Sequence, residues 1–89
     1  MKAFEVFVNG VRACTAGVAH DGVVSVIAHH FAGCGHDDSR LGAAALDVTN
    51  REYLHWDCPS LSLGDEITIR LVETQKVDVP ARKQPASEE

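Results

Sequence analysis

The sequence predicts a mainly β fold: a small antiparallel β-barrel or two-layer sandwich of five to six strands. Short valine- and isoleucine-rich segments recur between turn signals about 8–12 residues apart, and no segment shows the pattern of a long helix. A chain of 89 residues has room for one hydrophobic core. We expect a single β domain over residues 1–78. The last residues, 79–89, contain Pro80, Pro85 and a polar end, and we expect them to form a flexible, disordered tail.

The first element is a β-hairpin. Apolar side chains alternate over residues 4–8, and the run ends at Asn9-Gly10. This dipeptide favours a type I′ turn, because both central residues of that turn have positive φ. A regular two-residue turn pairs Glu5 with Cys14 on the outer face, so Cys14 is expected to point away from the core.

The segment that follows His20-Asp21-Gly22 is ambiguous. Residues 23–28 read Val-Val-Ser-Val-Ile-Ala, and β-branched side chains of this kind favour strands. Apolar residues at positions 23, 24, 27, 28 and 31 also fit one face of a helix, for which Asp21 would be the N-cap. We expect a strand, with a helix over residues 23–31 as the alternative.

The second half of the chain contains one further clear strand. Residues 31–40 hold two glycines and a polar run, which predicts a loop. Residues 41–49 fit either a short helix or a strand that runs into a turn, and residues 53–56 read as a short strand. Residues 67–72 alternate between apolar and mostly polar side chains, which is typical of a half-buried strand. The aromatic residues are expected to supply much of the core: Phe4, Phe7, Phe31, Tyr53 and Trp56.

Charge and cysteine content restrict the partners and the compartment. The formal charge of −5 and the lack of a basic run make nucleic acid and anionic membranes unsuitable partners. No stretch approaches the roughly 20 apolar residues of a membrane-spanning helix, and the first residues do not resemble a secretion signal. An odd number of cysteines, three, then argues for reduced thiols and a cytoplasmic protein.

One cluster of residues could bind a metal. Imidazole and thiolate groups suit Zn²⁺ and other divalent ions, and a glycine-flanked loop could bring such groups together. The candidate ligands are His29, His30, Cys34, His36 and Asp37. Because their spacing matches no zinc template, a solvated polar loop is the simpler interpretation, and metal binding is the alternative.

Catalysis is the least favoured class of function. Cys34 and Cys58 each have a histidine nearby in the sequence, but a cysteine nucleophile also needs a group that orients the histidine. No such group can be identified, and the phosphate-binding glycine motifs are missing. We therefore expect a protein that is not an enzyme and that needs no cofactor.

The predicted first hairpin offers a candidate interface. Phe7 lies opposite Arg12 on the outer face, and aromatic and arginine side chains often anchor protein interfaces. Alternatively, a second sheet covers Phe7. The sequence thus predicts a small non-catalytic binding domain that associates with itself or with a protein partner, through a sheet edge or through the face that carries Phe7 and Arg12.

Overall fold

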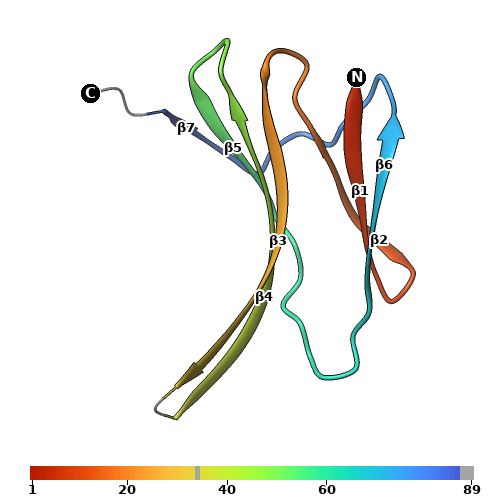
Figure 1. Cartoon of the computed structure of the whole chain (residues 1–89), viewed down its shortest axis with the longest axis vertical. Helices are drawn as coiled ribbons and strands as arrows, with labels where there is room; N and C mark the ends of the chain where they lie inside the picture. The colour runs from red at the N-terminus through yellow and green to blue at the C-terminus, as the bar shows by residue number, and fades with distance from the viewer. Residues whose placement is uncertain (34, 87–89) are drawn as a thin grey trace.

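The computed structural model describes residues 1–33 and 35–86, which form a two-layer β-sandwich (Figure 1). Its strands are β1 (Lys2–Val8), β2 (Val11–Gly17), β3 (Gly22–Gly33), β4 (His36–Asp47), β5 (Glu52–Trp56), β6 (Ile67–Glu73) and β7 (Arg82–Pro85). A three-stranded sheet has the order β2-β1-β6, and a four-stranded sheet has the order β3-β4-β5-β7. All strand pairs are antiparallel. The predicted mainly β class is confirmed, as a sandwich that is not closed into a barrel. No helix that could cross a bilayer occurs among the residues described.

The hairpin of β1 and β2 has the predicted turn but a different register. Asn9 and Gly10 have φ values of 53° and 82°, which fits the type I′ turn. Val6 pairs with Cys14 and Phe7 pairs with Arg12, so one residue of β2 is left over in a β-bulge. The prediction that Cys14 points away from the core is therefore wrong. The extra residue reverses its direction, and Cys14 is only 2% exposed.

The strands β3 and β4 form a hairpin much longer than the sequence predicted. Its register runs from the pair Gly22 and Asp47 to the pair Gly33 and His36. The prediction of a strand, and not a helix, at residues 23–28 is confirmed, but the prediction of a loop over residues 31–40 is wrong at residues 31–33 and 36–40, which belong to β3 and β4. Polar side chains are compatible with strands here because this end of the hairpin extends beyond the three-stranded sheet, where both of its faces meet water (Figure 1).

The chain crosses between the two sheets three times. The first crossing leads from β2 to β3, and the second runs over residues 57–66, where the backbone N–H of Leu61 donates to the carbonyl of Ser39 at 3.0 Å. The third, over residues 74–81, passes beside β2 and leads to β7. The prediction of a flexible tail over residues 79–89 is wrong at residues 82–85, because these residues form β7 and pair with β5. Residues 87–89 lie outside the described residues.

The core between the sheets consists mostly of small side chains. Its buried cluster contains Val6, Cys14, Ala16, Leu41, Ala43, Ala45, Leu54 and Trp56. Of the five aromatic residues expected in the core, only Trp56 is fully buried. Phe31 and Tyr53 are 54% and 43% exposed, because they lie on the face of the four-stranded sheet that points away from the core.

Candidate functional site

The strand β3 forms a free edge of the four-stranded sheet. It pairs with β4 over all twelve of its residues, and none of the residues described pairs with its other side. A free edge presents backbone N–H and C=O groups that can pair with another strand. The site is therefore a row of backbone donors and acceptors along one side of β3.

The composition of β3 does not protect this edge. Soluble proteins usually shield a free edge with lysine or another charge, with proline, or by keeping the strand short. Residues 22–33 contain no proline and no lysine, arginine, aspartate or glutamate. Only Val24, Ser25 and Val26 are half-buried, and the rest of the strand is exposed. Such an edge is open to strand addition along its whole length.

An apolar surface adjoins this edge on the outer face of the four-stranded sheet. We call it the outer patch, and it consists of Val23, Ile27, Ala44, Leu46 and Tyr53. The register explains the grouping, because Val23 pairs with Leu46 and Leu46 pairs with Tyr53, which places all three on one face. These residues line a shallow hollow of about 350 Å³. Val23 and Ile27 are 58% and 49% exposed, so a partner on the β3 edge would also cover apolar surface.

The outer face becomes polar next to the outer patch. A second hollow, of about 420 Å³, is lined in part by His29, Arg40, His55 and Arg82. The guanidinium of Arg40 forms an ion pair with Asp38 at 2.7 Å, and Nε2 of His55 lies 3.2 Å from Oε1 of Gln84. The rings of His29 and Phe31 pack edge to face, with 5.5 Å between the centroids and an angle of 61° between the planes. This polar region borders the apolar part of the edge.

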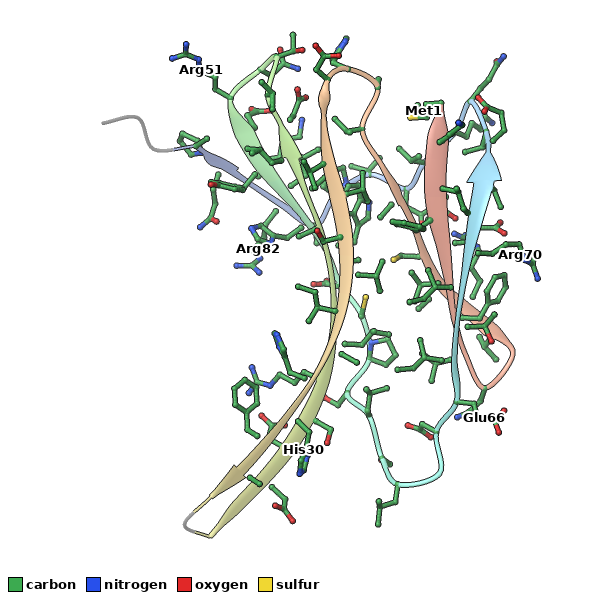
Figure 2. The ribbon with its side chains drawn as sticks, viewed as in Figure 1. Met1, His30, Arg51, Glu66, Arg70 and Arg82 are labelled. Carbon is green, nitrogen blue, oxygen red and sulfur yellow. The ribbon has the colours of Figure 1, made fainter. Side chains whose placement is uncertain are left out.

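The predicted pair of Phe7 and Arg12 lies on the other sheet, on the face that points away from the core. The two residues are opposite each other in the register, as predicted, and the second sheet does not cover Phe7. Each has an intramolecular partner. The guanidinium of Arg70 lies 5.0 Å from the centre of the Phe7 ring, whereas Arg12 donates to Asp78 at 2.9 Å and to Thr15 at 2.9 Å (Arg70 is labelled in Figure 2). Binding at this pair stays a prediction.

Four of the candidate metal ligands lie on a strand pair, His29 and His30 on β3 and His36 and Asp37 on β4. His29 and His30 are neighbours on β3 and therefore point to opposite faces (His30 is labelled in Figure 2). Nδ1 of His30 lies 2.8 Å from the hydroxyl of Ser39. Among the residues that the structure describes, no three histidine, cysteine, aspartate or glutamate side chains gather as metal ligands would. Cys34 and the side chain of His36 lie outside this description, so the metal-binding alternative stays a prediction.

Comparison of the chain with protein-family models, with curated proteins and with solved structures finds no match. Function is therefore inferred from the chain's own geometry. Sequence reasoning found the strand at residues 23–28 but not its free edge. A usable signal was present, because residues 22–33 are uncharged in a protein that is 24% charged.

Proposed function

We propose that this protein is a small non-catalytic binding module that associates with a second copy of itself through the free edge of β3. The observation that carries the proposal is the length of this edge. The strand β3 has twelve residues without formal charge or proline, and among the described residues nothing pairs with its outer side. Antiparallel pairing of two β3 strands would join the two four-stranded sheets into one continuous sheet, an arrangement that removes both free edges.

The sequence of β3 is compatible with a twofold axis. If the axis passes at Ile27, this residue faces its own equivalent, and Val23 of one copy faces Phe31 of the other. Ser25 then faces His29. Every apolar side chain on the outer face meets an apolar one, and each such cross-strand pair stabilises a sheet by about 0.2–1 kcal/mol. The outer patches of the two copies lie on the same face of the joined sheet and extend the apolar contact.

Charge favours this edge over the other surfaces. Each copy carries a formal charge of −5, so two copies repel each other over most orientations. The β3 edge is a long strip without formal charge, where two backbones can approach without placing like charges together. The same acidic charge disfavours nucleic acid and anionic membranes as partners. The proposal retains the cytoplasmic setting that the cysteine content predicts.

A pair of matched substitutions tests the proposal. Ile27 on β3 is 49% exposed and Ile69 on the edge strand β6 is 48% exposed, so a lysine side chain can reach solvent from either position. In the proposed dimer, Ile27→Lys places two like charges opposite each other at the axis. We expect light scattering after size exclusion to give a dimer for the wild type and for Ile69→Lys, and a folded monomer for Ile27→Lys.

Two outcomes would contradict the proposal. One is a wild-type protein that remains monomeric at about 100 μM, since even a weak specific dimer with a Kd near the micromolar range would assemble there. The other is a dimer that Ile69→Lys dissociates and Ile27→Lys does not, because the interface would then include β6. Far-ultraviolet circular dichroism on each variant confirms that a monomer is a folded one.

A further inference from the structure

Two cysteines from different sheets meet in the core. Cys14 belongs to β2 in the three-stranded sheet, and Cys58 lies two residues after the end of β5 in the four-stranded sheet. Cys14 is a buried member of the core cluster, and the half-buried Cys58 packs against that cluster. The two thiols influence each other's ionisation, since each contributes to the shift in the pKa of the other.

Both positions are held by local structure. The β-bulge in β2 turns Cys14 toward the core, where a regular hairpin would turn it outward. On the opposite sheet, Trp56 lies two residues before Cys58, and its indole N–H donates to the carbonyl of Asp78 at 2.7 Å. This bond fixes the end of β5. The contact between the thiols is therefore a consequence of two anchored backbones and not of two flexible loops.

We propose that Cys14 and Cys58 form a disulfide bond that joins the two sheets when the protein meets a small oxidised disulfide such as oxidised glutathione. The bond would link the layers of the sandwich covalently, as inter-sheet disulfides do in other β-sandwich domains. The disulfide would be reversible. In the reducing cytoplasm that we expect for this protein, the two cysteines would normally be thiols. This inference is independent of the proposed association through β3.

The chemistry runs in two exchange steps. Cys58 loses its proton to solvent, and its thiolate attacks one sulfur of oxidised glutathione. A mixed disulfide forms and one glutathione thiolate leaves, which takes up a proton. Cys14 then loses its proton, and its thiolate attacks the sulfur of Cys58 and releases the second glutathione. In sum, two protein thiols lose two electrons and two protons, and one oxidised glutathione becomes two reduced molecules.

The order of attack follows from the surroundings of the two thiols. Desolvation by burial raises the pKa of Cys14 to about 12, and Cys58 contributes further to this shift. Burial also raises the pKa of Cys58, although a hydrogen bond from Cys14 opposes that effect. Cys58 is the more accessible of the two and is therefore the first nucleophile. Both steps are expected to be slow near neutral pH and to accelerate as the pH rises.

The experiment uses the Cys34→Ser variant, so that the proposed pair supplies the only thiols of the chain. The protein is incubated with oxidised glutathione at several pH values. Mass spectrometry of the intact protein, thiol labelling in denaturant and the midpoint of thermal unfolding are then measured. We expect a mass decrease of two hydrogen atoms, no reactive thiol, no attached glutathione and a higher unfolding midpoint, all reversed by dithiothreitol.

Two single variants on the same background test the order of events. Cys14→Ala removes the resolving thiol and is expected to accumulate the mixed disulfide of Cys58 with glutathione. Cys58→Ala is expected to keep Cys14 as an unmodified thiol. If the Cys34→Ser protein keeps both thiols, or if it ends with glutathione on Cys58 and a free Cys14, the proposal is wrong. Neither result depends on whether the protein dimerises, because the mass of the single chain is measured.

Discussion

The two halves of the hairpin of β3 and β4 have the same backbone pairing in different surroundings. In the covered half, residues 22–28 with residues 41–47, every second side chain of β4 is buried against the three-stranded sheet. In the projecting half, residues 29–33 with residues 36–40, the side chains that are described are exposed or half-buried. Backbone pairing is therefore sufficient to extend β3 and β4 into the projecting half. Burial of their side chains requires the three-stranded sheet on the opposite side. The covered half holds the fold together, and the projecting half is available for contacts.

The largest expected effect compares two aromatic residues. One lies on β5, which pairs with the covered half, and the other lies in the projecting half. Trp56 pairs with Ala43 in the covered half and is 5% exposed, whereas Phe31 of the projecting half is 54% exposed. We expect Trp56→Ala to lower the free energy of unfolding by about 3–5 kcal/mol, since it removes a large buried side chain. Phe31→Ala is expected to change it by less than about 0.5 kcal/mol in the monomer. Urea unfolding of both variants measures the difference.

Equal losses for these two variants would show that the projecting half contributes to stability as much as the core does. The background for this measurement is Ile27→Lys, which prevents the proposed dimer from protecting Phe31. If Trp56→Ala does not fold at all, Trp56→Phe keeps the ring in the core and removes the indole N–H. That variant loses the bond to the carbonyl of Asp78, at a cost of about 1 kcal/mol.

A second, smaller effect concerns the segment that joins the two layers. The carboxylate of Asp78 accepts a hydrogen bond from Arg12 at 2.9 Å and another from the backbone N–H of Thr15 at 3.0 Å. We expect Asp78→Ala to lower the free energy of unfolding by about 1–2 kcal/mol, because the N–H of Thr15 loses its partner in a buried residue. Glu66→Ala, at an exposed position, is the control. A loss no greater than that of the control would mean that the crossing segment does not hold the layers together.

The difference between the two halves explains which parts of the fold can be predicted from the sequence. The turn at Asn9-Gly10 and the strand at residues 67–72 depend on local chemistry, namely positive φ and alternation, and both were predicted. The prediction of a loop over residues 31–40 rests on glycines and polar residues, which are typical of loops. These residues form strands because the end of β3 pairs with the start of β4. Such pairing depends on both segments and cannot be read from either one alone.

The bulge and the free edge were beyond local reasoning for a similar reason. Nothing in the residues around Cys14 indicates that β2 has one residue more than β1 at this point. This extra residue turns the Cys14 side chain toward the core and therefore toward Cys58. Likewise, the strand at residues 23–28 was predicted, but whether one or both of its sides are paired depends on the order of the whole sheet. The lack of charge over residues 22–33 was the one local signal of the candidate site.

A third prediction tests the turn that joins β4 to β5 at the end of the covered half. The carboxylate of Asp47 accepts hydrogen bonds from the backbone and the side chain of Asn50, at 3.1 and 2.9 Å. These bonds hold the pKa of Asp47 below its usual value. A lowered pKa in the folded state means that the stabilisation is complete above the pKa of the unfolded chain and is lost as the pH falls through the lower, folded value.

Urea unfolding between about pH 6 and about pH 2.5 measures this contribution. We expect Asp47→Ala to lose stability at the upper end of this range and to approach the wild type at the lower end. Asp37→Ala, an exposed position in the projecting half, is expected to follow the wild type throughout. A constant difference between Asp47→Ala and the wild type over the whole range would show that the carboxylate does not act through its charge.

The smallest expected effect lies on the face of the three-stranded sheet that points away from the core. Arg70 lies over the Phe7 ring and forms an ion pair with Glu5 at 3.4 Å, both at the surface. We expect Arg70→Ala to lower the free energy of unfolding by about 0.5–1 kcal/mol, because exposed contacts of both kinds are weak. A double-mutant cycle with Phe7→Leu separates the ring contact from the ion pair. A coupling free energy close to zero would mean that the contact with Arg70 does not stabilise the position of the Phe7 ring. The ring would then be as available to a partner as the projecting half of the hairpin is.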